Sequence, residues 1–255
     1  MKKIVVGDVH GCLDELLKLL EMVEVDPSDE VIFLGDVVDR GPRVLDAVRF
    51  VRQGCLEGRF KCLLGNHEEK HVRWAKYEEE RRTLGRKNPM RPFVGERAVQ
   101  HERLTEEERE WLSELPPFVR FKDGDRDWIA CHAGVPTDKP IEQQKVKTLV
   151  RTRWLDGVTG EYASTGDPNE IPEGAVYWDE KWAGPESVIH GHIVMDEPRF
   201  VEVSKGDAIV LGIDTGCCFG GKLTAAVFMG RGGCPMVLSV PAAWEYFPRR
   251  KTMDE

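Results

Sequence analysis

Long apolar runs are missing from this chain of 255 residues. No stretch approaches the roughly 18 consecutive apolar residues that a membrane-spanning helix requires. The opening Met1-Lys2-Lys3 precedes an apolar run that Asp8 and His10 interrupt, and that run is too short for a secretory signal. An excess of basic charge is also missing, because 45 acidic residues outnumber 36 basic ones and the formal net charge is -9. No cationic excess is therefore available to displace counterions from a nucleic acid. We therefore expect a cytoplasmic protein that forms no stable complex with nucleic acid or membrane.

Cysteines with CxxC spacing are absent as well. The seven cysteines are odd in number and none of them forms a CxxC motif, so we expect neither a disulfide framework nor a cysteine-rich zinc site. Internal repeats, low-complexity tracts and linkers are also missing. An apolar share of 41% and a charged share of 32% are typical of a globular protein, and we expect one domain over residues 1–255.

Three strand-and-turn units fill the first quarter of the chain. In each, a short apolar run leads into a glycine followed by Asp or Asn: Ile4–Val6 into Gly7-Asp8-Val9-His10-Gly11, Val31–Leu34 into Gly35-Asp36-Val37-Val38-Asp39-Arg40-Gly41, and Lys61–Leu64 into Gly65-Asn66-His67-Glu68. Helical patterns separate them, one with an apolar stripe at Leu13, Leu16, Leu17 and Leu20, the other over about 44–51. A βαβαβ opening is predicted, with the polar residues at the carboxyl edge of the sheet, where open sheets bind ligands.

The rest of the chain is predicted to be helical first and then rich in strands. We expect a charged helix from Glu68 to about Arg86 and then a loop to Pro92, so that a helical cap occupies about 68–103. Another helix begins at the capping box formed by Thr105 and Glu108. Strands are expected over about 118–122, 128–131, 188–190, 208–213, 223–229 and 236–240. The intervening residues 151–184, rich in Gly, Pro, Asp and Glu, are predicted to form a surface excursion.

Groups that bind metal ions follow most of these apolar strands. The candidate ligands are Asp8, His10, Asp36, Asn66, His132 and the neighbouring pair His190 and His192. Carboxylate, imidazole and amide oxygen together suit manganese, iron or zinc better than calcium, which prefers oxygen ligands alone. Six or so ligands exceed what one ion takes from a protein, whereas two ions that share a bridging Asp use all of them. Such a pair, about 3.5–4 Å apart, binds a phosphoryl oxygen and generates a hydroxide for in-line attack.

Five motifs in series resemble those of the phosphoprotein-phosphatase-type (calcineurin-like) metallophosphoesterases over nearly the whole chain. They are Gly7-Asp8-Val9-His10-Gly11, Gly35-Asp36-Val37-Val38-Asp39-Arg40-Gly41, Gly65-Asn66-His67-Glu68, His132-Ala133-Gly134 and Gly191-His192. The resemblance implies an α/β fold, a four-layer αββα sandwich with a binuclear metal centre at the sheet edge. It assigns Asp8, His10 and Asp36 to a first ion, with Asp36 bridging to a second ion held by Asn66, His132 and His192. Mn²⁺ is the expected cation, with Fe, Zn, Co, Ni or Mg as alternatives, and His190 falls outside the matching position.

The same family pattern makes His67 the general acid for the leaving oxygen and Asp39 the residue that orients it. An imidazole beside a carboxylate and near a bound phosphate keeps its proton more readily at neutral pH. The alternative for Asp39 is a salt bridge with Arg40. Arg40 itself resembles the family's phosphate-clamping arginine, whose planar guanidinium suits two phosphate oxygens.

Arg151 and Arg153 are further candidates for binding phosphate. The stretch Arg151-Thr152-Arg153-Trp154 is similar to an Arg-x-Arg-aromatic stretch in bacterial diadenosine-tetraphosphatase-like members of the family. Two arginines at i and i+2 project the same way in an extended chain, although a surface pair beside an acidic loop is the alternative. The segment 214–224 also resembles the closing segment of those members, and its Cys217 and Cys218 are expected to pack rather than to react.

The motifs define the reaction more closely than the substrate. The closing segment and the Arg-x-Arg-aromatic stretch favour hydrolysis of a dinucleoside polyphosphate such as diadenosine tetraphosphate. Glu68 and Asp39 instead match protein phosphatases, so a Ser/Thr or dual-specificity phosphoprotein phosphatase is the alternative. A non-catalytic metal-binding module would be expected to lack some of the ligands, and none is missing.

Overall fold

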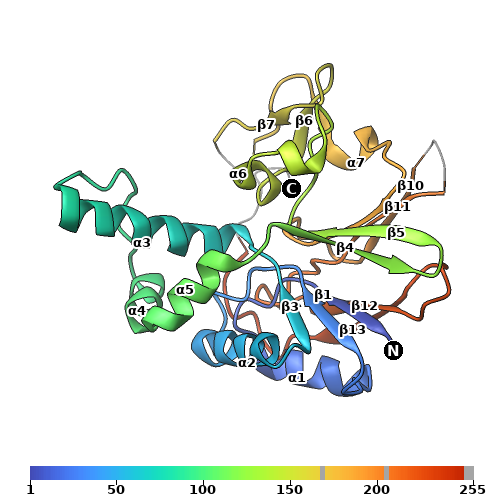
Figure 1. Cartoon of the computed structure of the whole chain (residues 1–255), viewed down its shortest axis with the longest axis horizontal. Coiled ribbons are helices and arrows are strands. Elements are labelled where there is room, and N and C mark those ends of the chain that lie inside the picture. Colours follow the sequence, from blue (N-terminus) through green and yellow to red (C-terminus); the bar gives the residue numbers. More distant parts are fainter. Residues whose placement is uncertain (167–169, 204–206, 250–255) are drawn as a thin grey trace.

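Two five-stranded sheets that pack face to face form the centre of the molecule. The computed structural model describes residues 1–166, 170–203 and 207–249. The first sheet has the strand order β13-β12-β1-β2-β3 and the second the order β10-β11-β9-β5-β4. Figure 1 shows the two sheets stacked, with α1 and α2 on the outer face of the first.

The first sheet contains the predicted βαβαβ opening. Its parallel strands are β1 (Lys3–Val6), β2 (Glu30–Phe33) and β3 (Phe60–Cys62), joined by α1 (Leu13–Met22) and α2 (Val44–Leu56), and the antiparallel strands β12 (Lys222–Phe228) and β13 (Met236–Pro241) extend it beyond β1. Leu13 and Leu16 are buried on α1 as expected, but Leu17 is 43% exposed. The buried stripe runs through Leu19 instead, so the prediction for Leu17 was wrong.

The second sheet repeats this polarity with strands from the second half of the chain. A hairpin joins β4 (Phe118–Asp123) to β5 (Arg126–Cys131), the two strands predicted over about 118–122 and 128–131. β5, β9 (Ser187–His190) and β11 (Ile209–Gly212) run parallel to one another. β10 (Arg199–Glu202), which we did not predict, pairs with the outer edge of β11. Three of its four residues are exposed, so the strand carries little of the apolar pattern that would reveal it.

Alternating side chains fix the order of the layers. Val5 and Ile32 point between the two sheets, where they pack with Trp128 and Phe228. Their neighbours along the strands, among them Phe33, point to the other face and pack under α1 and α2. Each square ångström of apolar surface removed from water stabilises the fold by roughly 25 cal/mol. Because β1 and β2 are buried on both faces, this stabilisation holds their ends in fixed positions.

The outer layer over the second sheet is built from short elements. It contains η1 (Ile141–Gln143), α6 (Val146–Leu149), α7 (Trp178–Lys181) and a small sheet of β6 (Trp154–Asp156), β7 (Tyr162–Ala163) and β8 (Ala175–Tyr177). Trp178 is fully buried against the second sheet. The αββα sandwich is confirmed, with these short elements in place of long helices on one side. The predicted surface excursion over 151–184 therefore contains a small sheet.

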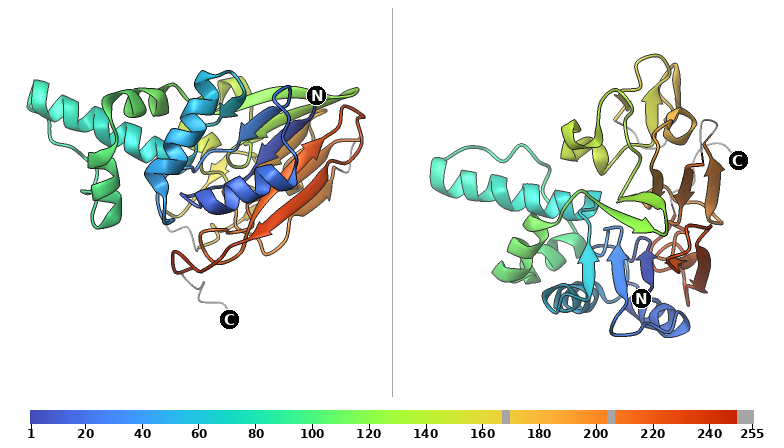
Figure 2. Two further views of the ribbon diagram at one scale, coloured as in Figure 1. Left: turned by 90° about the horizontal axis from the view of Figure 1, so that it is seen from below. Right: turned by 45° about the vertical axis from the view of Figure 1, so that its right-hand side comes forward.

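Three helices lie beside the open edge of the first sheet. They are α3 (Asn66–Leu84), α4 (Glu96–Arg103) and α5 (Glu106–Glu114). α3 begins at Asn66, two residues earlier than predicted, and both views in Figure 2 show its far end projecting away from the sheets. α4 lies within the helical cap predicted over about 68–103, but a separate helix was not predicted there; Val99 is exposed and none of the residues of α4 is buried. Within the described part of the chain, no helix is long and apolar enough to cross a membrane.

Candidate active site

The predicted ligands meet at one edge of the sandwich, because parallel strands of both sheets end there. Asp8, Asp36 and Asn66 follow β1, β2 and β3 of the first sheet. His132 follows β5 and His192 follows β9 of the second sheet. Asp36 and His132 approach each other across the gap, with 3.5 Å between Asp36 Oδ1 and His132 Nε2. The prediction that these residues would lie close together is confirmed.

Backbone strain is concentrated at these turns. Six non-glycine residues have positive φ among the residues described, and five belong to the candidate site: His10, Asp36, Asp39, Arg40 and His192. A left-handed conformation is unfavourable for a residue with a Cβ atom, and such residues cluster at functional sites. The strain persists because the flanking strands are buried on both faces and hold the turns in place.

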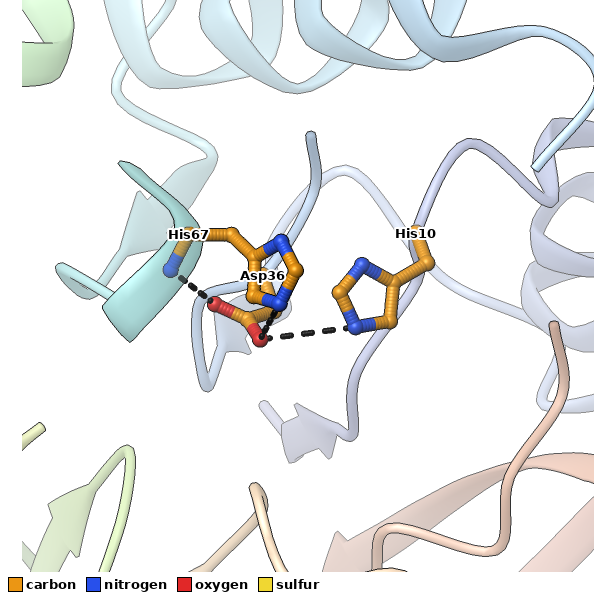
Figure 3. A group of neighbouring side chains, drawn as sticks. All are labelled: His10, Asp36 and His67. Carbon is orange, nitrogen blue, oxygen red and sulfur yellow. Dashed lines mark hydrogen bonds and ion pairs between the residues drawn. The ribbon is translucent and has the colours of Figure 1, made fainter. Parts of the chain in front are cut away.

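Asp36 lies between imidazoles from several elements. Its Oδ2 is 3.4 Å from His10 Nε2 and 3.9 Å from His67 Nε2, as Figure 3 shows. The backbone N–H of His67 donates to Oδ1 at 2.9 Å. Gly65 permits this approach, because a Cβ added there would lie 2.2 Å from Asp36 Oδ1. One carboxylate therefore faces two groups of imidazoles, one on each of its oxygens.

The second group brings together His132, Asn66 and His192. His132 Nε2 is 3.0 Å from Asn66 Oδ1, and the rings of His132 and His192 have centroids 5.0 Å apart. Backbone carbonyls fix the histidine tautomers: His132 Nδ1 bonds Leu34 O at 2.8 Å, and His10 Nδ1 bonds Val38 O at 2.8 Å. A carbonyl accepts a proton, so Nδ1 is protonated in both rings and Nε2 is the nitrogen with a lone pair for a ligand.

Buried carboxylates give this edge a strong negative potential. Burial, together with the neighbouring carboxylates of Asp214 and Asp36, raises the pKa of Asp8 well above its ordinary value. Burial also raises the pKa of Asp214. For Asp36 burial acts in the same direction, but the imidazoles of His132, His67 and His10 outweigh it and lower the pKa. Carboxylates that repel one another in this way would be stabilised by a divalent cation.

His190 lies beside this edge and was left out of the ligand set. It is 1% exposed, its Nδ1 bonds Gly191 O at 2.9 Å, and its ring packs edge-on against Trp178. Its Nε2 is buried without a hydrogen-bond partner among the described residues. Burial lowers the pKa of His190 to about 4. These contacts fit the expected role as a neighbour of the site.

Asp39 and His67 form a close pair, as the expected roles require. His67 Nδ1 lies 2.5 Å from Asp39 Oδ2, and the pair is buried. Asp39 also accepts from Arg97 Nε at 2.7 Å and lies 3.0 Å from His71 Nε2. The alternative, a salt bridge between Asp39 and Arg40, does not form, because Arg40 Nη1 instead lies 2.8 Å from His10 Nε2. His71 and Arg97 were not predicted as site residues, because neither belongs to one of the five motifs.

Burial changes the expected proton affinity of His67. We expected the adjacent carboxylate to help the imidazole keep its proton at neutral pH. Burial is the larger effect and lowers the pKa of His67 to about 4, although Asp36 and Asp39 oppose it. The two carboxylates act in the expected direction, and the expectation, which concerns the ring with phosphate bound nearby, stays a prediction. A phosphate dianion bound nearby would raise this pKa, because opposite charge favours the protonated ring.

Glu68 holds the turn that carries Asp36. Its fully buried carboxylate accepts from the backbone N–H groups of Asp36 and Val37 at 2.8 Å each, Val38 at 3.1 Å and Gly65 at 3.1 Å. Four bonds to backbone donors pin two strand-end turns against each other. The similarity of Glu68 to protein phosphatases therefore has a structural explanation that is independent of substrate.

Three arginines surround a cavity above these residues. The cavity has a volume of about 360 Å³ and is lined by Arg40, Arg151 and Arg153 together with Lys70, Trp154, Tyr162 and Phe219, among others. The guanidinium of Arg40 lies 4.9 Å from the Phe219 ring centroid. Arg153 Nε lies 3.3 Å from His192 Nε2, and Arg151 pairs with the carboxylate of Glu69. Both Arg151 and Arg153 therefore reach the cavity, and neither is only a surface residue.

The sequence comparisons agree with this geometry. Residues 1–213 match the family model described as Calcineurin-like phosphoesterase. A Bacillus subtilis (strain 168) protein named bis(5'-nucleosyl)-tetraphosphatase PrpE (asymmetrical) is 30% identical over 244 residues, which cover 88% of this chain and 89% of the relative. An Oceanobacillus iheyensis protein of the same name is 28% identical over 237 residues, which cover 89% of each chain. A crystal structure described as "a putative diadenosine tetraphosphatase" superposes with a TM-score of 0.72 at 27% identity, covering 94% of this chain and 93% of that one.

Proposed function

Since this chain belongs to the calcineurin-like phosphoesterase family, we propose that it hydrolyses dinucleoside polyphosphates with the help of two divalent cations, and that Mn²⁺ is the working ion. One observation carries the proposal: the two oxygens of Asp36 face different imidazole groups, His10 on one side and His132 on the other. A cavity lined by cations opens directly above this carboxylate.

The donor set fits a cation pair. Asp8, His10 and Asp36 would hold one ion, and Asp36, Asn66, His132 and His192 the other. Ligand atoms of Asp36, His132 and His192 lie within 4.8 Å of one another, as do those of His10, Asp36 and His67. Burial, with Arg40 near His10 and Arg153 near His192, lowers the pKa of both imidazoles well below the ordinary value, and neutral imidazole is the form that binds metal.

The side chains around the cavity would carry out the rest of the reaction. Bound cations supply a water molecule of lowered pKa and neutralise charge on the phosphoryl group. Arg40 and Arg153 would bind the phosphoryl oxygens. His67 presents Nε2 to the cavity while Nδ1 bonds Asp39, so a protonated His67 would donate from Nε2 to the departing oxygen. Asp39 holds the ring in that orientation.

The cavity walls favour a nucleotide. Trp154 and Tyr162 from the small sheet and Phe219 beside Arg40 place aromatic surface next to guanidinium groups. Aromatic rings stack on nucleobases, and arginines bind phosphates. The relatives from B. subtilis and O. iheyensis are named for dinucleoside tetraphosphate hydrolysis, which supports the same substrate class here. All seven cysteines are free thiols, which supports a reducing compartment such as the cytoplasm.

Product analysis tests the proposal. The manganese-loaded protein is incubated with diadenosine tetraphosphate and, in parallel, with a phosphothreonine peptide, with chelator-treated protein as the control. ATP plus AMP would show asymmetrical cleavage, and two ADP symmetrical cleavage. An intact dinucleotide together with phosphate released from the peptide would refute the proposal and favour a phosphoprotein phosphatase.

A further inference from the structure

A groove beside α3 and α4 is lined by four cationic side chains and no carboxylate. Lys70 and Arg73 come from α3, Arg91 from the loop that follows it and Arg97 from α4, with Phe93 among the apolar neighbours. We call this feature the cationic groove; its volume is about 440 Å³. The chain as a whole has a net charge of -9, so this concentration of positive charge stands out and would attract an anionic ligand.

Two of these cations have no carboxylate partner. Arg73 pairs with Glu69, and Arg97 pairs with Asp39. Lys70 and Arg91 form no ion pair within the part of the chain that the structure describes. Burial and the neighbouring Arg97 lower the pKa of Lys70, which shows how crowded the positive charges are. A bound polyanion would relieve this repulsion.

The cationic groove adjoins the catalytic cavity at Lys70. Lys70 lines both of them. It lies one helical turn beyond Asn66 on α3, and Arg73 lies almost one turn further on. At a rise of about 1.5 Å per residue, the path from Asn66 to Arg73 spans about 10 Å. The cations therefore lead away from the metal-binding edge along the helix.

The His67 ring lies between the catalytic cavity, which it lines, and Arg97 of the cationic groove. Arg97 Nη2 lies 3.2 Å from His67 Nδ1, and Arg97 is also a wall of the cationic groove. In an in-line reaction the general acid must lie beside the departing oxygen. The departing oxygen takes its proton from His67 Nε2 inside the catalytic cavity, and the phosphates beyond that oxygen can reach the cationic groove past Lys70, which lines both.

We propose that the cationic groove binds the phosphate tail of the departing nucleotide, a nucleoside polyphosphate. In this step the oxygen of water bonds to phosphorus and the water gives up a proton to the solvent. The bridging P–O bond breaks, and its electron pair stays on the departing oxygen, which takes a proton from His67; the ring then regains a proton from the solvent. Lys70 and Arg91 then neutralise the remaining phosphates of the tail. The inference rests on the proposed function, and it explains how cleavage close to one nucleoside leaves the longer phosphate chain on the other product.

The test compares substrates with and without a tail. kcat/KM is measured for diadenosine tetraphosphate and for p-nitrophenyl phosphate with the wild type, Arg91→Ala and Lys70→Ala. Arg82→Ala is the matched control, because Arg82 lies on the exposed end of α3, pairs with Glu79 and does not line the groove. Calorimetric titration of the manganese-loaded proteins with ATP and with AMP supplies a readout that does not depend on turnover.

We expect Arg91→Ala and Lys70→Ala each to lower kcat/KM for diadenosine tetraphosphate about tenfold relative to kcat/KM for p-nitrophenyl phosphate, which corresponds to about 1.4 kcal/mol. The affinity of these two variants for ATP should fall by a similar factor and their affinity for AMP much less. Arg82→Ala should keep the wild-type ratio of kcat/KM values and the wild-type ratio of ATP affinity to AMP affinity. If the wild type cleaves the dinucleotide and Arg91→Ala and Lys70→Ala keep its ratios, the groove does not bind the tail and the proposed function stands. If the wild type cleaves only p-nitrophenyl phosphate, the proposed function itself is wrong, and the groove inference with it.

Discussion

Replacing Asp39 by Asn tests the link between this carboxylate and the proton donor. Asp39 Oδ2 lies 2.5 Å from His67 Nδ1 and 2.7 Å from Arg97 Nε, and Oδ1 lies 3.0 Å from His71 Nε2. Although burial opposes it, these neighbouring imidazoles lower the pKa of Asp39 far below its ordinary value. The carboxylate is therefore ionised at any working pH and is surrounded by donors.

An asparagine has only one oxygen to offer to these three donors. Its amide NH₂ would face His71 or the pair His67 and Arg97, so at least one charge-assisted hydrogen bond is lost, and each contributes about 1.5–3 kcal/mol. We expect kcat for diadenosine tetraphosphate to fall about a hundredfold or more, roughly 3 kcal/mol in the barrier. The loss should be much smaller for p-nitrophenyl phosphate, because its leaving group needs little protonation.

The assay is steady-state kinetics on both substrates, with metal content and circular dichroism confirming that each variant is folded and loaded. Asp46→Asn is the control, because Asp46 is exposed on α2 and pairs only with Arg43 among the described residues. An equal loss on both substrates in a fully loaded Asp39→Asn protein would show that Asp39 supports the fold and does not orient the acid. The reasoning would then be refuted.

Three further predictions follow from the same geometry. His67→Asn should keep its metal ions by elemental analysis and lose most turnover of the dinucleotide; full activity would contradict the general-acid role. Gly65→Ala should lower Tm and metal content, because a Cβ at this position would lie 2.2 Å from Asp36 Oδ1. Gly233→Ala is the control and should match the wild type, because a Cβ added at Gly233 would have no atom within 4 Å. The metal-free protein should lose stability as pH falls from about 6.5 to 4, because burial lowers the pKa of His67 and His190 to about 4 and the unfolded chain binds the protons first. Each of the two residues accounts for about 3 kcal/mol of this loss in the free energy of unfolding. Urea unfolding at several pH values should therefore show a smaller loss of stability for His190→Gln than for the wild type.

The strand-end ligands were predictable because local sequence and local structure agree. A short apolar run followed by Gly-Asp can only be a buried strand that stops at a turn, and parallel strands bring such turns to one edge. Asp8, Asp36 and Asn66 were therefore located without knowledge of the fold. His132 and the pair His190 and His192 were candidates for the same reason, and the family motifs selected His192 over His190.

Contacts made only in the folded chain were not predictable. Arg97 reaches Asp39 from α4, 58 residues away in the sequence, and no periodic pattern marks that helix. Asp214 was quoted within the closing segment but not as a site carboxylate; its position two residues after β11, matching that of Asp8 after β1, was the available signal. The pKa of His67 depends on burial, which a motif does not report.

The number of metal ions bound to each chain tests the central claim most directly. The account predicts two Mn²⁺ ions for the wild type by equilibrium dialysis with elemental analysis, none retained tightly by Asp36→Asn, and one by His192→Ala. This pattern follows because Asp36 would be shared by both ions and His192 would belong to one. A single ion in the wild type, or two ions retained by Asp36→Asn, would contradict the shared-carboxylate centre on which the proposed chemistry depends.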